Sequence, residues 1–463
     1  MTVSTGRTQR QTARIAVIGS GISGLSAAWL LSKTCDVTLY ESAGRLGGHA
    51  QTVNVRIDGS DVPIDTGFIV YNEVNYPNLV ALFDHLDVPT TASDMSFAAS
   101  MDGGRFEYSG TGLKGLLGQK KNALRPRFWH MLRDVMKFYR HAPALLARPD
   151  TEDLTLGDYL QREAYSSAFI HDHLMPMGAA IWSMTARDMA NYPLHAFLRF
   201  FVNHGLLLLS GRPQWRTVEG GSREYVRRVA ADFSGTVRLN ARIASIRRNP
   251  ASVTVTDTGG HSDTFDEVVI AAHADEALSM LSDADGEERD TLGAFSYTPN
   301  RAVLHSDPNL MPKTRAVWSS WNYLSARNGN EPKGNHANGN EALCVTYWMN
   351  RLQRLKTSRD LFVTLNPHRA PQAELVHGIY DYTHPLFDGR ALAAQGRLWQ
   401  LQGRNRTWFC GAYFGSGFHE DGLQSGLAVA EALAGNRRPW TVENESGRIS
   451  IARPAPALRE AAE

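Results

Sequence analysis

The chain has 463 residues, 43% of them apolar, which is enough for a sizeable core and more than one domain. Its 48 lysines and arginines almost balance 47 aspartates and glutamates, so the net charge of +1 gives no general argument for a nucleic-acid partner. The three cysteines, Cys35, Cys344 and Cys410, show neither a disulfide framework nor zinc-site spacing, and we expect a reducing cytoplasm and no metal.

The first motif joins a strand to a helix through three glycines. Residues 15–18 have the pattern of a buried strand, and GSGISG, an alanine- and leucine-rich helical run and a second strand follow. Gly19 permits a tight turn, Gly21 lets the backbone approach a pyrophosphate, and Gly24 lets helix and strand pack closely. Glu41 ends the second strand, where a carboxylate accepts hydrogen bonds from a ribose diol. A dinucleotide site is predicted, and an ordinary glycine turn is the alternative.

The segment ESAGRLGGHAQT, which starts at Glu41, separates FAD from NAD. It resembles the second signature of the large FAD family that includes amine oxidases, protoporphyrinogen oxidase and carotenoid desaturases. The resemblance implies that Arg45 neutralises the pyrophosphate and that Gly47 and Gly48 pass against the ribityl chain and flavin. The residue chemistry agrees, because a guanidinium fork suits phosphate oxygens and glycine leaves room for a ring system. We expect FAD, bound non-covalently because no Cys or His stands in a recognisable flavinylation motif.

A basic segment spans residues 112–148. It contains nine lysines or arginines against one acid, Asp134, and leucines and aromatic residues alternate with the cations at roughly helical spacing. Such a helix can lie on a bilayer, where each cation near anionic lipid contributes on the order of 1 kcal/mol. The alternative is a solvated helix whose apolar side meets the core. A second apolar stretch, residues 195–211, either lines a tunnel for an apolar substrate or forms a buried helix.

The rest of the chain divides between the two expected domains. The Gly220–Gly221 pair precedes an amphipathic helix and, in the family, re-enters the flavin domain. Residues 297–400 contain short aromatic and β-branched runs that suit an antiparallel sheet. Within these runs Trp321, Tyr347 and Trp348 either line the substrate cavity or fill the core.

We therefore expect an α/β (α+β overall) fold with a discontinuous Rossmann-like FAD-binding domain and a substrate domain of antiparallel sheet plus helices. The expected boundaries are 14–70, 215–283 and 405–440 for the FAD-binding domain, 71–214 and 284–404 for the substrate domain, and 1–13 and 441–463 for the tails.

The segment GSGFHEDGLQSG, residues 415–426, belongs to the last signature of the resemblance, a strand, a glycine-rich turn and a helix. In the family the N-terminus of this helix points at the flavin pyrimidine ring, where its N–H groups stabilise negative charge. An imidazole held by a carboxylate is a general base at neutral pH, so His419 is a candidate base, with Glu420 as its orienter or as the base itself. Helix capping is the alternative for this segment, and His49, directly after Gly48, is the next candidate base.

The resemblance as a whole implies a set of cofactor-binding residues. They are Gly19, Gly21, Ser23, Gly24, Glu41, Arg45, Gly47, Gly48, Thr66 and Gly67 (in the segment IDTGF), Gly411, Asp421, Gly422 and Leu423.

A narrower resemblance concerns the substrate. The segments GRLGGHAQT, DTGFIVYNEVNYPNL, SDMSF and GSGFHEDGLQSG resemble bacterial FAD proteins that are similar to the flavin domain of plant cyclopropane fatty acid synthases and include the methyl-fatty-acid desaturase of furan fatty acid synthesis. This implies dehydrogenation of a methyl-branched unsaturated acyl chain of a phospholipid to a conjugated diene, with hydride passing to flavin N5 and with O2 or another electron acceptor. An anionic surface at the inner face of the membrane would then be a partner.

Two other functions stay open. An amine oxidase needs an aromatic pair flanking the flavin, for which Tyr413 and Phe414 are candidates. A non-catalytic FAD protein that accompanies a lipid methyltransferase is the other alternative.

Overall fold

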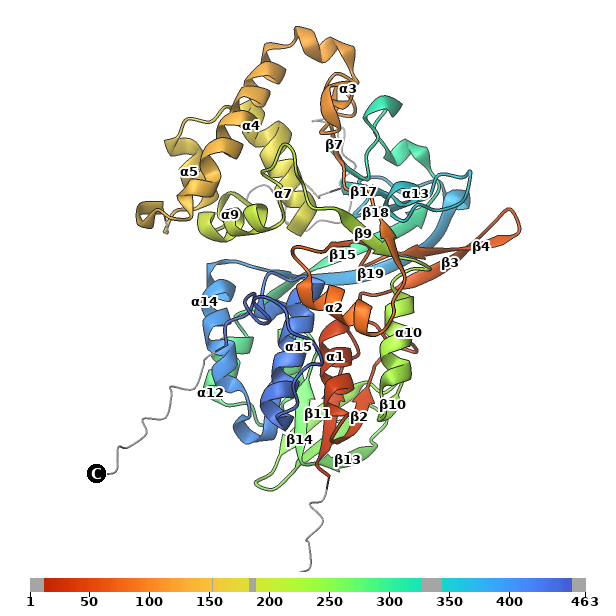
Figure 1. Cartoon of the computed structure of the whole chain (residues 1–463), viewed down its shortest axis with the longest axis vertical. Helices are drawn as coiled ribbons and strands as arrows, with labels where there is room; N and C mark the ends of the chain where they lie inside the picture. Colours follow the sequence, from red (N-terminus) through yellow and green to blue (C-terminus); the bar gives the residue numbers. More distant parts are fainter. Residues whose placement is uncertain (1–11, 152, 183–188, 326–343, 452–463) are drawn as a thin grey trace, which may run out of the picture. The chain divides into compact units, whose positions relative to one another are not determined.

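The computed structural model describes residues 12–151, 153–182, 189–325 and 344–451. The chain forms two compact units, each assembled from separate segments (Figure 1). Unit 1 comprises Met1–Gly48, Val226–Ala294 and Ala394–Glu463, and unit 2 comprises His49–Tyr225 and Phe295–Ala393. Residues 1–11 and 452–463, which belong to the two expected tails, lie outside the described residues.

Unit 1 is built on a five-stranded parallel sheet. In pairing order its strands are β10 (Thr236–Arg238), β2 (Asp36–Tyr40), β1 (Arg14–Ile18), β14 (Glu267–Ile270) and β20 (Thr407–Phe409). The central strand is a continuous apolar run because helices cover parallel sheets on both faces. Helix α1 (Ile22–Leu31) connects β1 to β2, and α15 (His419–Ala434) follows β20.

Helices α1 and α15 pack against each other through glycine. A Cβ atom added at Gly426 would lie 2.2 Å from the backbone oxygen of Ser23, and one at Gly422 would lie 2.8 Å from the Ser23 hydroxyl. Both glycines are therefore required by the helix packing, whatever else they contact.

A second, antiparallel sheet in unit 1 consists of β11 (Ile243–Arg248), β12 (Val253–Asp257) and β13 (Ser262–Phe265). The remaining helices are α10 (Arg223–Asp232), which begins in unit 2, α11 (Ala274–Met280), α12 (Gly286–Leu292) and α14 (Gly389–Leu398), which also spans the boundary between the units.

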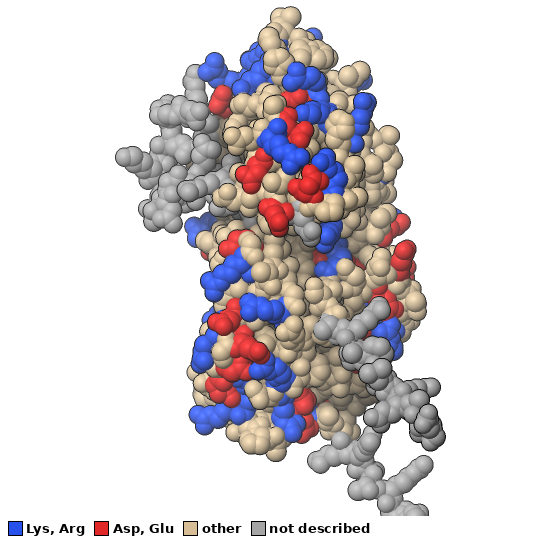
Figure 2. All heavy atoms as spheres, turned by 90° about the vertical axis from the view of Figure 1, so that its left-hand side faces the viewer, with Lys and Arg blue, Asp and Glu red and all other residues tan. Residues whose placement is uncertain are grey.

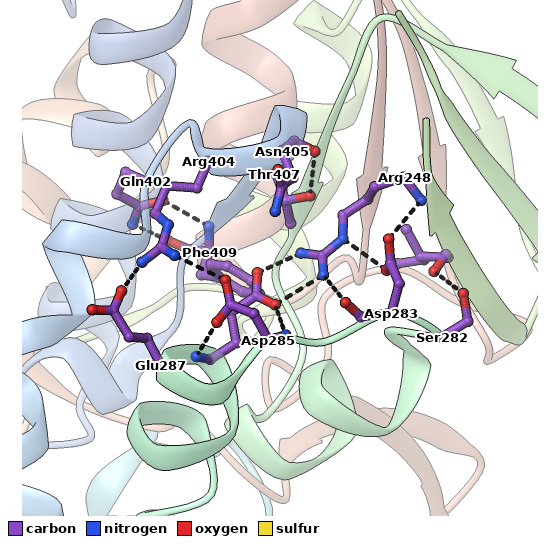
Figure 3. Close-up of polar contacts among 12 residues, drawn as sticks. Arg248, Ser282, Asp283, Asp285, Glu287, Gln402, Arg404, Asn405, Thr407 and Phe409 are labelled. Atoms are coloured by element: carbon purple, nitrogen blue, oxygen red, sulfur yellow. Dashed lines mark hydrogen bonds and ion pairs between the residues drawn. The ribbon is translucent and has the colours of Figure 1, made fainter. Parts of the chain in front are cut away.

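Ion pairs connect α12 to its surroundings in unit 1 (Figure 3). The guanidinium of Arg248, at the end of β11, donates to both carboxylate oxygens of Glu288 and to Asp283, and the Arg248 and Glu288 side chains are almost fully buried. Arg404 binds Glu287 and, at 2.8 Å, Asp285, the residue that caps α12. Since a buried charge is costly unless it is paired, these contacts fix α12 against β11 and the turn before β20.

Unit 2 is built on a seven-stranded sheet. In pairing order its strands are β19 (Val376–Leu386), β15 (Ser296–His305), β18 (Phe362–Leu365), β17 (Cys344–Trp348), β16 (Trp321–Leu324), β7 (Phe97–Met101) and β8 (Phe106–Ser109). All neighbours are antiparallel except β16 and β7. Two smaller sheets complete the strands, the ribbon of β3 (Thr52–Ile57) and β4 (Ser60–Asp65), and β5 (Tyr71–Asn72), β9 (Trp215–Val218) and β6 (Thr90–Ala92).

Most helices of unit 2 fall between β8 and β9. They are α3 (Gly112–Leu116), α4 (Pro126–Leu145), α5 (Leu156–Arg162), α6 (Ser167–Phe169), α7 (Met175–Trp182) and α9 (Leu194–Asn203), while α2 (Pro77–His85) precedes β6 and α13 (Met349–Leu352) follows β17. The apolar stretch 195–211 thus contains a helix, α9, whose Phe197 and Phe201 are fully buried. Within the described ranges, no helix has both the length and the apolar character of a membrane span.

The compact units differ in their bounds from the domains that we expected. Residues 49–70 group with unit 2, because Val55, Val62 and Ile64 of the β3–β4 ribbon share a buried cluster with residues of the seven-stranded sheet such as Val345. Residues 215–225 also group with unit 2, where β9 pairs with β5 and β6.

Candidate functional site

The turn between β1 and α1 has the geometry that the glycine motif predicts. Gly19 adopts a φ of +100°, which favours glycine, and its N–H donates to the backbone oxygen of Tyr40. A Cβ at Gly24 would lie 1.9 Å from the oxygen of Gly19, whereas one at Gly21 would meet no atom within 4 Å. Among the described residues no side chain caps the start of α1. The turn thus offers an open backbone face beside uncapped helix N–H groups, which fits a pyrophosphate.

Glu41 points back at this turn. Its carboxylate accepts hydrogen bonds from the Ser20 N–H at 3.0 Å, from the Ser20 hydroxyl at 2.5 Å and from the Ala43 N–H at 2.8 Å. The Ser42 hydroxyl is a fourth donor, at 3.2 Å. An ionised carboxylate has about four acceptor positions, so a ribose hydroxyl would have to replace one of these donors. The Ser20 hydroxyl also receives the N–H of Gly47 at 3.2 Å. Ser20 therefore connects both nucleotide motifs, and sequence reasoning missed it although it stands between the first two glycines.

The second motif lies directly against the first. Gly48 has a φ of +54°, and a Cβ there would lie 3.1 Å from the Cα of Gly21. Arg45 folds over this segment and donates to the backbone oxygen of Gly48 at 2.8 Å. The structure thus brings Gly21, Arg45, Gly47 and Gly48 together in unit 1, whereas the Ser23 hydroxyl faces Gly422 in the interface between helices α1 and α15.

Several polar groups of the last motif make hydrogen bonds within the protein. Gly411 donates to and accepts from the Ser425 hydroxyl, at 3.0 and 3.1 Å. Asp421 accepts from the N–H of Phe418 at 2.8 Å, which caps α15, and from Arg448 Nε at 2.6 Å. The Asp421 carboxylate therefore caps the helix, as in the alternative interpretation of this segment, and its contact with the cofactor stays a prediction.

Leu423, which we predicted to bind the cofactor, lies one turn into this helix, and its contact with the cofactor stays a prediction. It is the fifth residue of α15 and is fully buried, and the residue before it, Gly422, already donates its N–H to the backbone oxygen of Phe418. Because only the first N–H groups of a helix lack intrahelical partners, the N–H of Leu423 is not among those that a ligand can use.

His419 is the first residue of α15 and is half-buried. Burial lowers the pKa of its imidazole to about 3. The ring is therefore neutral at physiological pH and can accept a proton, although it is a weaker base than an ordinary histidine. Glu420 is fully buried and accepts from Gln424 Nε2 at 3.0 Å.

The other candidate base, His49, lies in unit 2 within a cluster of rings. Its ring centroid is 5.0 Å from that of Tyr382 and 5.7 Å from that of His384. Tyr382 and His384 alternate along β19 and so face the same side of the sheet. The Tyr382 hydroxyl hydrogen-bonds Thr66 Oγ1 at 2.8 Å and Gln51 Oε1 at 2.9 Å. This cluster brings together His49 and Thr66, which we predicted, with Tyr382 and His384, which we missed.

The segments around His49 and Gly67 pass very close to each other. A Cβ at Gly67 would lie 2.1 Å from the backbone oxygen of His49, and this oxygen accepts the N–H of Phe68 at 2.8 Å. Gly67 thus has a packing role that its place in the motif IDTGF does not by itself reveal.

Asp65, in the same motif, is a fully buried acid. It accepts from Thr52 Oγ1 at 2.6 Å, from the Ser222 N–H and hydroxyl at 2.8 Å, and from Gln353 Nε2 at 2.9 Å. These contacts tie β4 to the turn at Gly221 and to the end of α13. Burial, the dominant effect, raises the pKa of Asp65 to about 6 despite these donors.

This raised pKa predicts a pH dependence of stability. Below about pH 4 the folded and unfolded chains both hold the proton, and between about pH 4 and 6 the unfolded chain releases it first, so rising pH costs stability. The full cost, about 3 kcal/mol, applies above pH 6. We expect Asp65→Asn to abolish this loss of stability with rising pH. In urea unfolding, the free energy of unfolding of the variant should therefore rise relative to that of the native chain between pH 4 and pH 7. Asp61→Asn, an exposed acid on the same ribbon, should show no such gain, and equal behaviour of the two variants would contradict the prediction.

The three predicted substrate residues do not form one group. Trp321 and Tyr347 pair across β16 and β17 with edge-to-face rings 4.8 Å apart, next to the buried cluster that includes Val345. Trp348 points to the other face of the sheet, as successive strand residues must, and packs against Trp318. Trp321 and Tyr347 therefore remain a candidate substrate wall, and Trp348 belongs to a different cluster.

Trp321 has a further property that bears on binding. Its indole Nε1 is buried and has no hydrogen-bond partner among the described residues. A buried donor without an acceptor costs free energy, and because this nitrogen has almost no accessible surface, a ligand oxygen would reach it only after neighbouring side chains move.

The aromatic pair considered for an amine substrate, Tyr413 and Phe414, is almost completely buried in unit 1, with ring centroids 5.1 Å apart at an angle of 47°. The rings contact each other, and a Cβ at Gly411 would touch the Tyr413 ring at 2.4 Å. This packing leaves no space between them for a ligand.

Comparison with known proteins identifies relatives. The family model described as flavin containing amine oxidoreductase matches residues 22–306. A Mycobacterium tuberculosis protein named as a flavin-containing monoamine oxidase, AofH, is 28% identical over 262 residues, which are 54% of this chain and 55% of the relative. The chain thus aligns with about half the length of the curated relatives it matches.

Solved structures show the same fold at low identity. A CLA-producing fatty acid isomerase from P. acnes has a TM-score of 0.62 at 16% identity. The alignment covers 91% of this chain and 98% of the isomerase chain. Putrescine oxidase bound to putrescine has a TM-score of 0.62 at 15% identity, with coverages of 92% and 99%. Cyclohexylamine oxidase from Brevibacterium oxydans has a TM-score of 0.60 at 15% identity, with coverages of 91% and 100%. These likenesses confirm the predicted fold class.

Proposed function

We propose a function from the premise that this chain belongs to the flavin-containing amine oxidoreductases. It is an FAD-dependent oxidoreductase. FAD, when bound, takes up a hydride from the substrate and passes the electrons to dioxygen or another acceptor. The proposal concerns the substrate, a methyl-branched unsaturated fatty acyl chain of a phospholipid that is dehydrogenated to a conjugated diene.

The reaction removes two hydrogens from neighbouring carbons. The allylic C–H bond next to a methyl-substituted double bond is weakened, so a hydride leaves from this carbon and a proton from the next. The electron pair of the second C–H bond forms the new double bond. This bond is conjugated with the original double bond, so the product is a conjugated diene. The protein must orient the acyl chain, exclude water and accept the proton, for which His419 and His49 are our candidates.

The proposal rests on the carboxylates beside the buried cluster that contains Val345 and Tyr347, because these carboxylates are already paired within the protein. Asp65 is next in the chain to Ile64 of the cluster, and both its oxygens already accept hydrogen bonds. Asp94 is next to Met95 and binds Ser96, Ser320 and, at 3.1 Å, Arg351. A cationic amine needs a carboxylate or an aromatic cage, whereas an acyl chain needs only apolar contact and one donor for its carbonyl. Trp321 Nε1 is our candidate for this donor.

The comparisons agree with this proposal without selecting it. Proteins with this fold act on a fatty acid in one case and on amines in others, according to their names. The narrower motifs DTGFIVYNEVNYPNL and GSGFHEDGLQSG favour the lipid substrate. Oxidation of a small amine is the second candidate, supported by the name of the M. tuberculosis relative. A non-catalytic partner of a lipid methyltransferase is the third.

Anaerobic titration of the purified protein distinguishes the three. We expect phosphatidylcholine with a methyl-branched monounsaturated chain to bleach the visible flavin absorbance and to gain the ultraviolet absorbance of a conjugated diene. Phosphatidylcholine with the unbranched chain is the matched control and should react far more slowly. Bleaching by putrescine or benzylamine alone would establish the amine function, and bound flavin that no lipid or amine reduces would establish the non-catalytic one.

A further inference from the structure

The basic segment of unit 2 has an exposed face that the core does not use. Phe128, Met131, Val135 and Phe138 of α4 are buried, so one apolar side of the helix meets the core, as in the second of the two alternatives that the sequence leaves open. The opposite stripe consists of Trp129, Arg133, Met136 and Arg140, spaced by four, three and four residues, and all four are exposed. Trp129 and Met136 are 52% and 47% exposed.

The segment before α4 carries two more exposed apolar side chains. Leu113 on α3 is 77% exposed, and Leu124, at the end of a 3₁₀ turn (Lys120–Leu124), is 87% exposed. The Trp129 indole donates to the backbone oxygen of Ala123 at 2.9 Å, which places Trp129 beside this turn. Eleven large apolar side chains are exposed in the described chain. Four of them fall within 24 residues, namely Leu113, Leu124, Trp129 and Met136. This concentration along the chain separates the segment from the scattered exposed apolar residues that every protein surface has.

Cations surround these apolar side chains. Lys114, Lys120, Lys121 and Arg140 are exposed, and together with the rest of residues 112–148 they give the segment nine basic residues against one acid. Some cations have other contacts, since Arg127 binds Asp172 and Lys137 donates to the backbone oxygen of Glu163. Figure 2 shows lysine and arginine side chains over the whole height of the face drawn, intermixed with acidic and uncharged side chains.

We propose that this face, defined by Leu113, Leu124, Trp129 and Met136 with Lys114, Lys120, Lys121 and Arg140, docks on an anionic phospholipid bilayer. A tryptophan among exposed aliphatic side chains suits the boundary between headgroups and acyl chains, and lysines suit anionic headgroups. A nucleic acid would match the charge, but exposed leucines contribute nothing to phosphate contacts. The inference rests on this surface alone and does not depend on the proposed reaction.

The test is co-sedimentation of the full-length holoprotein with vesicles. We expect binding to phosphatidylcholine vesicles that contain phosphatidylglycerol and much weaker binding to phosphatidylcholine alone. Replacing Lys114, Lys120 and Lys121 by glutamine should weaken binding on the order of 100-fold, at about five-fold per cation. Replacing Leu113 and Leu124 by glutamine removes apolar contact without changing the charge and should also weaken binding.

A matched variant controls for the net charge. Replacing Arg359, Arg390 and Arg397, which are exposed outside this face, by glutamine removes the same three charges and should leave binding unchanged. Equal loss in this control, no preference for anionic vesicles, or binding of single-stranded nucleic acid with the same dependence on Lys120 and Lys121 would overturn the proposal. Flavin reduction by the lipid solubilised in detergent needs no vesicle, so failure of docking and failure of the proposed reaction are measured separately.

Discussion

Replacement of Gly21 by alanine is expected to yield a folded protein that has lost its FAD. A methyl group at this position meets no protein atom within 4 Å, and the φ of −61° is compatible with alanine, so the apoprotein should keep its stability. The methyl group would instead occupy the open backbone face at the start of α1, which a pyrophosphate must approach. Overpacking of the methyl group against the bound cofactor costs about 1–3 kcal/mol, which raises the dissociation constant for FAD roughly 5- to 150-fold. The measurements are the flavin-to-protein absorbance ratio after purification and a reconstitution titration.

Two glycines serve as controls for this variant. Gly24→Ala places its methyl group 1.9 Å from the backbone oxygen of Gly19, so it should lose stability as well as FAD, because a backbone atom cannot move aside. Gly396→Ala lies in open space on α14 and should bind FAD normally. Stoichiometric flavin in purified Gly21→Ala would show that this turn does not hold the pyrophosphate.

The local parts of the fold could be predicted from the sequence. The strand expected over 15–18 is β1, Arg14–Ile18, and Glu41 follows β2 directly. Such elements are readable because a continuous apolar run and a glycine turn are encoded within about thirty residues. The antiparallel sheet of unit 2 was visible in the same way from its aromatic and β-branched runs.

Contacts between distant segments could not be predicted. His49 meets Tyr382 and His384 only because β19 forms the edge of a sheet whose register the sequence does not state. The parallel pairing of β16 with β7 is equally invisible, since the two strands are separated by more than two hundred residues. The place of Trp348 was predictable in principle, because alternation along β17 puts it on the face opposite to Tyr347.

Replacement of His419 by alanine is expected to leave FAD bound and to slow flavin reduction by the branched lipid by at most about 100-fold, the lower end of the contribution of a general base, because an imidazole whose pKa is near 3 is a weak base. The residue is the first of α15, whose start we predict to face the flavin, and burial keeps its imidazole in the proton-accepting form. His261→Ala, at an exposed turn of unit 1, is the matched control and should reduce its flavin at the native rate. An unchanged rate in His419→Ala would contradict this role and leave His49 as the candidate base. The same titration of His49→Ala tests that alternative.

The pH profile of reduction separates the two histidines further. Because burial depresses the pKa of His419 to about 3, this group is already deprotonated at pH 5 and contributes no inflection to the rate between pH 5 and 8. The same shift costs stability in acid, since the unfolded chain takes up a proton near pH 6.5 and the folded chain does so only near pH 3. His419→Ala should therefore lose less stability than the native chain as the pH falls from 6.5 toward 3. An inflection between pH 5 and 8 that persists in His419→Ala and vanishes in His49→Ala would show that the proton passes to the ring cluster of unit 2.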